Sequence, residues 1–503
     1  MSKHLSFPLV LLFTILLLAG CTTTPVSIVH LPTVTPMQGK TATALQPTDS
    51  NPTLVPIKTD TPAPSKMIPE ISYSFQVKWD FPNNTVDVDQ IATYKNNSIV
   101  SINDLYMIAD TNTWDNCLDI HTIQQGNGTE ITNWELERNW LLIPLAAPLA
   151  PGEEIRLELI YTIKIPPIPE DSAATRPIPF GYTQNQVNLV DWHLYFPPFR
   201  AESGWIMYHP HYYGEHQVYE TANFEIQLEM VNPPANLTIA ASSAPVATAN
   251  HHFAYQLSDA RNFVFSAGTS YSILEDRVGD VVIYSYAFSP FSNSAAKEAL
   301  STTKKSVELY NRLFGPYPHQ TLSIVEADFL DGMEYDGLYF LSRGFYNLYD
   351  GTDRTYLTLI AAHETAHQWW YAEVGNDQFM HPWLDESLAT YSEYLFYELE
   401  GKNTTDWWWA YRVNFYQPSG KIDLAIDDYP GYLPYRNAVY LRGAKFFHDL
   451  RTSVGDDVFF GFLRELYSTA RDDILSPQIF WEILSNRTDV NISAIQTEYF
   501  SAP

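Results

Sequence analysis

The sequence is poor in cysteine, with two residues in 503, Cys21 and Cys117. Cys21 ends a leader-like segment, and its thiol would be consumed if that segment is processed as described below. Only Cys117 would then carry a thiol, so no intrachain disulfide could form even in an oxidising compartment. The stability of the fold must therefore come from packed cores rather than from covalent cross-links.

Basic residues are also scarce: 29 Lys and Arg stand against 58 Asp and Glu, for a net charge of -29. Such an acidic surface repels phosphate backbones and excludes nucleic acid as a partner. The simplest reading of this charge is solubility. Hydrophobic residues make up 45% and aromatic residues 15% of the chain, which is ample for packed cores. The length predicts two domains with additional tails.

Long apolar runs are limited to the start of the chain. Residues 1–21 have a basic beginning, an apolar run from Phe7 to Leu18, and the ending Leu-Ala-Gly-Cys. The run is too short for a membrane span, and the ending resembles a bacterial lipobox. We therefore expect a lipoprotein signal peptide, with lipidation at Cys21, followed by a disordered Thr/Pro-rich linker over 22–68. These features predict a lipid anchor in the membrane and a location on the extracytoplasmic face of a bacterial cell membrane.

Residues 69–287 read as strands throughout. Their apolar and polar residues alternate between turns rich in Pro, Gly and Asn, for example in "YSFQVKWDF", "EIRLELIYTIKI" and "NFEIQLEMV". Residues 288–503 change to helical spacing, with one clear strand in "TLSIVEADF". The predicted fold class is multidomain α+β, with a β-sandwich followed by a mainly helical domain.

The stretch "AAHETAHQWW" places His363 and His367 four residues apart with Glu364 beside the first. Residues i and i+4 share one face of a helix, so both imidazoles can reach one Zn²⁺. Glu364 lies one residue further round and is placed to take a proton from a metal-bound water. The pattern predicts a catalytic zinc site on a helix.

A third ligand is found on the next predicted helix. Glu386 follows His367 by 19 residues, in "WLDESLATYSEY". The intervening residues finish the first helix, turn, and begin an antiparallel return, so Glu386 can face the two histidines. Glu393 lies two helical turns further along and is predicted to hydrogen-bond the far nitrogen of a ligating histidine. The sequence therefore predicts one zinc ion held by His363, His367 and Glu386.

The surrounding sequence resembles the gluzincin aminopeptidases, the family of aminopeptidase N and leukotriene hydrolase. "HETAHQWW" matches the family motif HExxHQW, and "WLDESLATYSEY" is similar to WLNEGFAxYxE. "DGMEY" (331–335) stands where the family has GAMEN, and "YRNAVYLRGAKFF" (435–447) resembles its Tyr-x4-Tyr-x-x-Gly segment. The resemblance covers about residues 75–500 and implies a β-sandwich followed by a thermolysin-like zinc peptidase domain. The chain resembles a short form that lacks the family's C-terminal helical solenoid.

The resemblance also implies roles for residues that spacing alone does not assign. Tyr440 corresponds to the tyrosine that stabilises the tetrahedral oxyanion, and Tyr435 is the tyrosine paired with it. Glu334 corresponds to the glutamate that binds the free α-ammonium group of a peptide. The neighbouring Gly332 and Met333 are expected to contact the substrate through their backbone.

The sequence departs from the family at four places: Asp331 and Ser387 replace glycines, and Tyr335 and Asp385 replace asparagines. No clear match exists for the second amine-binding residue that the β-domain contributes. A further cluster, "HPHYYGEHQ" (209–217), contains three histidines and a glutamate, and we interpret it as a loop with incidental histidines.

The sequence thus predicts a lipid-anchored zinc metallopeptidase that acts on peptides, most readily as an aminopeptidase. Two alternatives stay open. The same site could serve an endopeptidase or another zinc hydrolase, or the chain could be an inert surface-binding module that has kept the fold.

Overall fold

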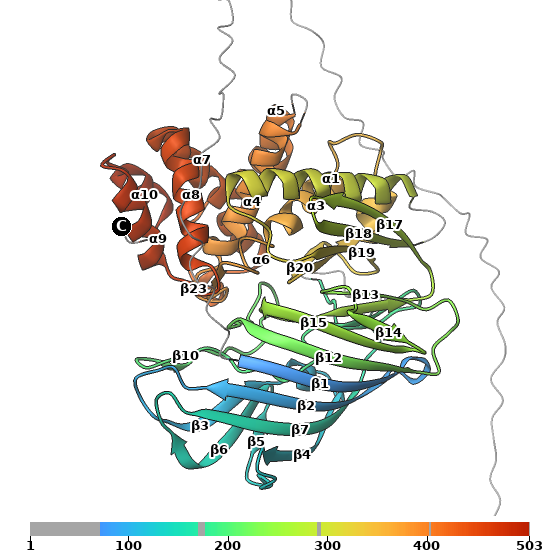
Figure 1. Ribbon diagram of the computed structural model, residues 1–503. Coiled ribbons are helices and arrows are strands. Elements are labelled where there is room, and N and C mark those ends of the chain that lie inside the picture. Colours follow the sequence, from blue (N-terminus) through green and yellow to red (C-terminus); the bar gives the residue numbers. More distant parts are fainter. Residues whose placement is uncertain (1–70, 170–176, 289–292, 402–403, 502–503) are drawn as a thin grey trace, which may run out of the picture. The chain divides into compact units, whose positions relative to one another are not determined.

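The computed structural model describes residues 71–169, 177–288, 293–401 and 404–501 (Figure 1). All of them belong to one compact unit, Lys66–Pro503. The predicted signal peptide, Cys21 and the whole of the predicted linker lie outside the described residues. Within the described ranges, no helix is both long enough and apolar enough to cross a bilayer.

A seven-stranded sheet forms the largest part of the N-terminal domain. Its strand β1 (Ile71–Asp80) pairs in parallel with β12 (Ala222–Val231) and antiparallel with β2 (Thr85–Lys95). Alternate side chains of β1, such as Phe75, Val77 and Trp79, are buried, as the alternating sequence predicted. The remaining strands are β4 (Leu118–Gln125), β7 (Glu154–Lys164), β14 (Ala247–Ala249) and β15 (His252–Ala260), in the order β14-β15-β12-β1-β2-β7-β4.

Smaller sheets complete this domain and share one hydrophobic core with the large sheet, so the region is a sandwich. One has the order β3-β6-β5, with β3 (Ile102–Ile108), β6 (Trp140–Leu149) and β5 (Glu135–Glu137). Another has the order β13-β16-β9-β8, with β13 (Thr238–Ala241), β16 (Phe265–Gly268), β9 (Val187–Leu189) and β8 (Gly181–Tyr182). A ribbon joins β10 (Phe199–Arg200) to β11 (Gly204–Trp205).

The C-terminal domain combines a five-stranded sheet with helices (Figure 1). The sheet order is β17 (Tyr271–Val278), β18 (Val281–Phe288), β19 (Thr321–Ala327), β21 (Leu338–Ser342) and β20 (Gly332–Tyr335). The helices are α1 (Asn293–Leu313), α2 (Arg343–Asn347), α3 (Tyr356–Ala366), α4 (Trp383–Leu399), α5 (Thr405–Trp407), α6 (Tyr432–Arg436), α7 (Gly443–Val454), α8 (Asp456–Ala470), α9 (Pro477–Arg487) and α10 (Ser493–Tyr499). A short ladder pairs β22 (Gly375–Asn376) with β23 (Ile474–Leu475).

The sheet topology corrects the predicted boundary between the two domains. Residues 271–288 are strands, as predicted, but they form β17 and β18, and β18 pairs in parallel with β19 of the C-terminal sheet. The change of domain therefore falls near residue 270 rather than at 287. Alternation in a sequence identifies a strand, but it does not show which sheet the strand joins.

One buried arginine links the two domains. Arg261 follows β15 of the sandwich and is 2% exposed. Its guanidinium group donates hydrogen bonds of 2.6–3.0 Å to backbone carbonyls on both sides of the junction, those of Tyr219, Tyr371, Ala372, Glu373 and Asp473. Gly375 makes room for this group, because a Cβ there would lie 2.3 Å from the Arg261 Cζ atom. Arg261 thus satisfies carbonyl groups that no apolar side chain could satisfy.

Replacing Arg261 by methionine should lower the free energy of unfolding by about 3 kcal/mol, because it leaves several buried carbonyls without donors. Denaturant unfolding would measure this change. The matched control is Arg277→Met, at an exposed position of β17, which should change stability by less than about 0.5 kcal/mol. An Arg261→Met protein as stable as the parent would contradict the proposed role of Arg261 at the junction.

Candidate active site

Two histidines face each other at the end of helix α3. The helix ends at Ala366 with His367 as its C-cap. His363 and His367 are 4% and 1% exposed, and their Nε2 atoms lie 3.1 Å apart. The i, i+4 spacing therefore brings both imidazoles to one point, as the sequence predicted.

Glu386, in the first turn of α4, completes the group. Its Oε2 atom lies 3.2 Å from His363 Nε2 and 3.6 Å from His367 Nε2. The ligand atoms of the three residues all fall within 4.8 Å of one another. Two imidazole nitrogens and one carboxylate form the donor set of a catalytic zinc site that keeps a position open for water. The residues thus fit the predicted zinc.

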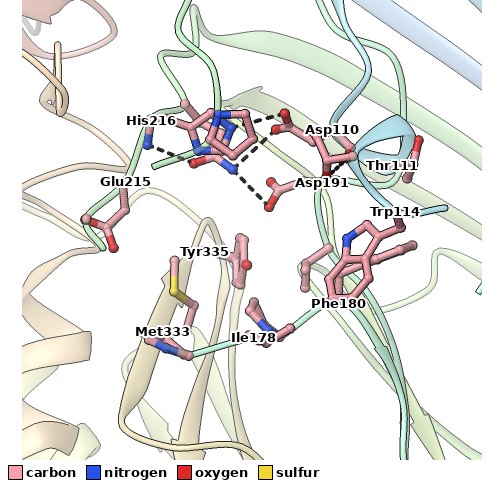
Figure 2. Close-up of a pocket in the computed structure, with 17 residues that line it drawn as sticks. Asp110, Thr111, Trp114, Ile178, Phe180, Asp191, Glu215, His216, Met333 and Tyr335 are labelled. Atoms are coloured by element: carbon pink, nitrogen blue, oxygen red, sulfur yellow. Dashed lines mark hydrogen bonds and ion pairs between the residues drawn. The ribbon is translucent and has the colours of Figure 1, made fainter. Parts of the chain in front are cut away.

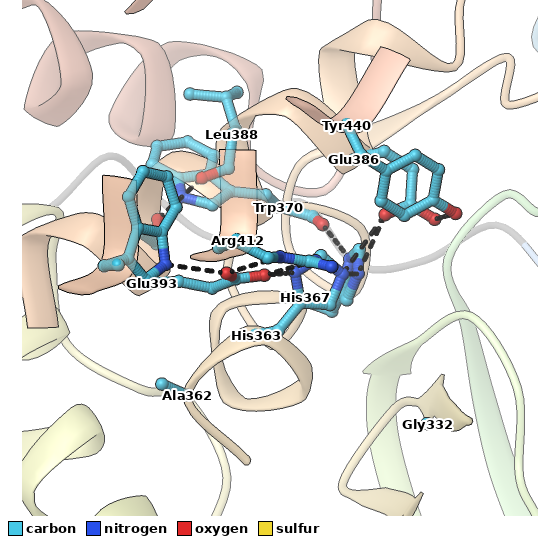
Figure 3. A network of polar contacts seen from close by, with 12 residues as sticks. Gly332, Ala362, His363, His367, Trp370, Glu386, Leu388, Glu393, Arg412 and Tyr440 are labelled. Carbon is cyan, nitrogen blue, oxygen red and sulfur yellow. Dashed lines mark hydrogen bonds and ion pairs between the residues drawn. The ribbon is translucent and has the colours of Figure 1, made fainter. Parts of the chain in front are cut away.

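The outer nitrogen of each histidine is held by a carboxylate, and Figure 3 shows the one beside His363, Glu393. His363 Nδ1 donates to Glu393 Oε1 at 2.8 Å, and His367 Nδ1 donates to Asp385 Oδ1 at 2.7 Å. These bonds place the proton on Nδ1 and leave the Nε2 lone pairs directed at the metal position. Glu393 has the role predicted for it. Asp385, noted in the sequence as a departure from the family, performs the same task for the second histidine.

Glu393 is fully buried and is itself surrounded by donors. Arg412 donates two hydrogen bonds to it at 3.0 and 2.8 Å, and Trp408 donates one at 3.0 Å. Burial raises the pKa of the Glu393 carboxyl, but the Arg412 charge and the hydrogen bonds outweigh it and bring the pKa below its ordinary value. Both partners lie on the π-helical segment Trp408–Val413, a local irregularity of a kind common at functional sites.

Ser387 is the second departure from the family pattern beside the third ligand, and Gly443 leaves room for its side chain. Its hydroxyl donates to the Val439 carbonyl at 2.6 Å. A Cβ on Gly443 would lie 2.0 Å from the Ser387 Oγ atom, so the close contact between α4 and α7 requires glycine at 443. The substitution therefore leaves the position of Glu386 intact.

Glu364 lies beside the metal position with one carboxylate oxygen unsatisfied. Its Oε2 atom is buried and has no hydrogen-bond partner among the described residues. Burial raises the pKa of this carboxyl to about 8, against the opposing effect of His363 and His367. A Cβ on Gly332 would lie 2.1 Å from Glu364 Oε1, so strand β20 passes directly over the carboxylate. Such a group can exchange protons near neutral pH.

Tyr440 lies beside the third predicted ligand, Glu386. Its hydroxyl donates to Glu386 Oε1 at 2.5 Å, and its ring is nearly parallel to that of His363, with centroids 6.1 Å apart. Tyr440 belongs to the π-helical segment Asn437–Arg442, which follows α6. Tyr435, on α6, is buried with its ring centroid 5.9 Å from that of Tyr440. The two tyrosines that were predicted as a pair thus lie next to each other beside the third ligand.

Strand β20 forms the edge of the C-terminal sheet and carries Gly332, Met333 and Glu334 to the cleft. The residue before it, Asp331, has φ +67°, a left-handed conformation that suits the glycine of the family motif and that aspartate tolerates better than most residues. Glu334 is 6% exposed, and its Oε1 atom has no hydrogen-bond partner in the described part of the chain.

Glu215 is the functional residue that sequence reasoning missed. Its carboxylate joins those of Glu334 and Glu386 in a group whose oxygens lie within 4.8 Å of one another. Burial raises the pKa of both Glu215 and Glu334 well above the ordinary value, and repulsion from neighbouring carboxylates raises it further, at Glu334 against the opposing effect of His367. The sandwich therefore does contribute a second acidic residue. Glu215 belongs to the segment "HPHYYGEHQ", whose sequence shows an acidic residue but not its proximity to Glu334.

The three histidines of that loop have structural roles, in line with the prediction. His209 stacks on Trp140 with ring centroids 3.9 Å apart. His211 contacts the carbonyl of Tyr213 at 2.6 Å. His216 Nε2 lies 3.1 Å from Asp110 Oδ1. Each imidazole thus helps to shape the loop that holds Glu215.

These groups line a cleft of about 920 Å³, a volume that includes its solvent-open part. The cleft contains the zinc-ligand position, the Glu364 carboxylate, the edge strand β20 and the Glu215–Glu334 pair. Arg412, Tyr432 and Arg436 lie along its remaining wall. Such a site can hydrolyse a bond next to a bound cation.

We expect the purified protein to bind about one equivalent of zinc, and His363→Ala and Glu386→Gln to lose most of it because each removes a ligand. Metal analysis by mass spectrometry after dialysis would measure this. His209→Gln is the control and should retain zinc, since His209 packs against Trp140 away from the ligands. Zinc retained by the His363→Ala protein would contradict the site.

Comparison with known proteins agrees with this geometry. Residues 298–499 match the peptidase family M1 domain. The chain is 25% identical over 266 residues to aminopeptidase N of Lactobacillus delbrueckii subsp. lactis, covering 48% of this chain and 30% of that protein. It is 36% identical over 111 residues to aminopeptidase M1-D of Oryza sativa subsp. japonica, covering 20% and 13%. The chain thus spans at most about a third of the length of these curated relatives.

The fold is similar to that of the M1 zinc metallopeptidase from Deinococcus radiodurans. The TM-score is 0.62 at 17% identity, and the match covers 87% of this chain and 94% of that one. A mutant of that enzyme, with a TM-score of 0.60, 17% identity and coverage of 87% and 94%, was solved with a Tyr-Ser-Ala substrate. The likeness confirms the predicted fold class of a β-sandwich followed by a helical catalytic domain.

Proposed function

The chain belongs to peptidase family M1, and from this we propose that it is a zinc aminopeptidase that removes N-terminal residues from peptides. The observation that carries the proposal is the position of two carboxylates, half-buried Glu215 and buried Glu334, beside the ligands His363, His367 and Glu386. The two carboxylates crowd each other, and one Glu334 oxygen has no hydrogen-bond partner among the described residues, so a substrate ammonium group would stabilise their ionised forms. A single zinc ion fits the set of two imidazoles and one carboxylate formed by His363, His367 and Glu386.

Zinc, when bound, would polarise water and the scissile carbonyl as a Lewis acid. Glu364 takes a proton from the attacking water. Its buried carboxylate lines the cleft at the metal position, and one of its oxygens has no hydrogen-bond partner among the described residues. It then passes that proton to the amine that leaves as the peptide bond breaks. The raised pKa of Glu364 suits a group that both accepts and returns a proton.

Tyr440 stabilises the oxyanion of the substrate's tetrahedral intermediate by donating its hydroxyl proton. In the structure this hydroxyl donates to Glu386 instead, so it already points at the reaction centre. The exposed edge of β20 offers backbone groups that can pair with an extended peptide. Gly332 lets this backbone lie close to Glu364, where a side chain would collide with the carboxylate.

The carboxylate pair limits the register of the substrate. An α-ammonium group held by Glu215 and Glu334 places the first peptide bond, and no later one, at the metal. An endopeptidase would need to bury these two carboxylates against a neutral peptide, at a large desolvation cost. An inert binding module would have no use for a buried carboxylate with an unpartnered oxygen, such as Glu364, or for the Tyr440 hydroxyl beside Glu386.

We expect the protein to trim a peptide with a free N-terminus one residue at a time and to leave the same peptide intact when it is N-acetylated. Glu334→Gln and Glu215→Gln should each lower kcat/KM on the free peptide by about 10²-fold or more, since each removes a charge from the ammonium site. Glu364→Gln should abolish turnover while zinc stays bound. Mass spectrometry of timed digests would measure these changes.

Equal cleavage of the acetylated peptide would show that Glu334 is not an amine-binding residue and would favour an endopeptidase. Zinc binding without cleavage of either peptide would contradict the peptidase function.

We also propose that the enzyme acts outside the cytoplasmic membrane, held there by a lipid on Cys21. The support is the sequence alone: an apolar leader that ends in Leu-Ala-Gly-Cys, followed by a Thr/Pro-rich stretch. Such a tether would keep the catalytic unit close to the membrane surface.

Cys21→Ala should move the protein out of the membrane fraction of expressing bacterial cells, because a lipidated cysteine is the proposed anchor. Fractionation followed by immunoblotting would detect the shift, with Cys117→Ala as the matched control that should stay in the membrane fraction. Membrane association that survives Cys21→Ala would contradict the anchor.

A further inference from the structure

The catalytic cleft is acidic on the side that would hold the amino group of a substrate. Glu215 and Glu334 lie there, and Figure 2 shows Glu215 with Met333 on that side. Among the described residues that line the cleft, the only arginines or lysines are Arg412 and Arg436. A short peptide carries the complementary charges, an ammonium group at one end and a carboxylate at the other.

Of the two arginines, Arg436 keeps N–H donors available. Arg412 is paired with the buried carboxylate of Glu393. Arg436 donates from Nε and Nη2 to Asn437 Oδ1, at 3.2 and 2.7 Å, and no ion pair joins it to a carboxylate within the described ranges. Its Cζ atom lies 4.2 Å from the centroid of the Tyr416 ring, and this stacking fixes the plane of the guanidinium group. The donors that remain can bind a carboxylate through two parallel hydrogen bonds.

The direction of a bound peptide follows from how β20 crosses α3. A carboxylate oxygen of Glu334 lies within 4.8 Å of a ring nitrogen of His367, at the C-terminal end of α3. Gly332, two residues earlier on the strand, lies over the preceding turns of the helix, because a Cβ there would be 2.7 Å from Ile360 and 2.1 Å from Glu364. Since Glu364 acts at the cleaved bond, a peptide with its amino group at Glu334 runs toward Gly332 and the N-terminal half of α3.

Arg436 lies on this downstream side. It stacks on Tyr416, whose hydroxyl lies 3.2 Å from that of Tyr356, the first residue of α3. Tyr356 precedes His363 by about two helical turns, or about 10 Å. Arg436 also precedes Tyr440 by about one turn, which keeps it near the reaction centre. An extended peptide advances about 3.3 Å per residue, so roughly two or three residues after the cleaved bond bring its C-terminal carboxylate to Arg436.

Asp331 is the acidic residue that would oppose an anion on this side. It lines the same cleft immediately before β20. Its Oδ1 atom accepts a hydrogen bond of 3.1 Å from the N–H of Gly332, and the Arg412 charge offsets its own. Arg436 is thus the group on this side whose charge is available to an anionic end of the substrate.

We infer that Arg436 binds the C-terminal carboxylate of short peptides, so that the enzyme favours substrates of about three or four residues with a free C-terminus. The inference rests on the proposed function, because the amine-binding pair sets the direction and register of the peptide. It deepens that function by naming the substrate class. A peptide held at both charged ends has its first peptide bond fixed between two contacts, whereas a longer chain loses the second contact.

The test compares peptides as free acids and as C-terminal amides, all with a free N-terminus. The series is leucine followed by alanines, from two to about eight residues in all, and the full-length zinc-loaded protein is assayed for leucine release. We expect the acid-to-amide ratio of kcat/KM to reach about tenfold at three or four residues and to fall to about one at eight. Arg436→Gln should bring the ratio for the short peptides to about one. Arg436→Lys should keep part of it, because lysine retains the charge without the planar pair of donors.

Arg277→Gln is the matched control, because it removes an equal charge at an exposed position of β17 and should leave the ratios unchanged. Equal kcat/KM for acid and amide at every length would overturn the inference and leave the proposed function standing. Equal losses for acids and amides in the Arg436→Gln protein would also overturn it, since a purely structural role of Arg436 would affect both.

Binding of the same peptides to the zinc-loaded Glu364→Gln protein, measured by calorimetry, separates this inference from the proposed function. Tighter binding of the acids that is lost on adding Arg436→Gln would support the Arg436 site. If that preference is found but the parent protein releases no leucine, the proposed function fails and the Arg436 site stands.

Discussion

The catalytic site depends on a buried carboxylate that does not touch the metal position. Glu393 is fully buried, and its two oxygens accept hydrogen bonds from His363, Arg412 and Trp408. A charge in this position is tolerated only because each oxygen is paired, and the pairing ties α3, α4 and the following π-helical segment together. The orientation of the His363 imidazole, and with it the ligand geometry, follows from this one neutralised charge.

The site is also unusual in how many acids it holds close together. Glu215, Glu334 and Glu386 approach one another within 4.8 Å, with Glu364 nearby on α3. Carboxylates at this distance repel, and burial adds to the cost, so the arrangement is favourable only when cations enter. A bound zinc ion would neutralise the charge at Glu386, and a substrate ammonium group would neutralise the charge at Glu215 and Glu334. Metal binding and substrate binding therefore relieve the same electrostatic strain.

Much of the site could be predicted from the sequence because its residues are set by helical spacing. His363, Glu364 and His367 share a short helix, and Glu386 and Glu393 share the next, so local periodicity fixed their relations before any fold was known. Glu215 could not be predicted in this way. It lies in an irregular segment between β11 and β12, and its distance from Glu334 depends on how the sandwich packs against β20. The domain boundary was misplaced for a related reason, because the sequence of neither strand shows that β18 pairs with β19.

The arginine that joins the domains has a consequence for how specificity is inherited. Arg261 donates to the carbonyl of Tyr219, which lies four residues beyond Glu215, and the Tyr219 hydroxyl in turn donates to Asp191. Of the two acidic residues that face each other in the cleft, Glu215 thus comes from the sandwich, while Glu334 and the predicted zinc ligands come from the C-terminal domain. A change in the sandwich can therefore alter one wall of the cleft without altering the ligand set, so long as the interface around Arg261 keeps the two parts in register.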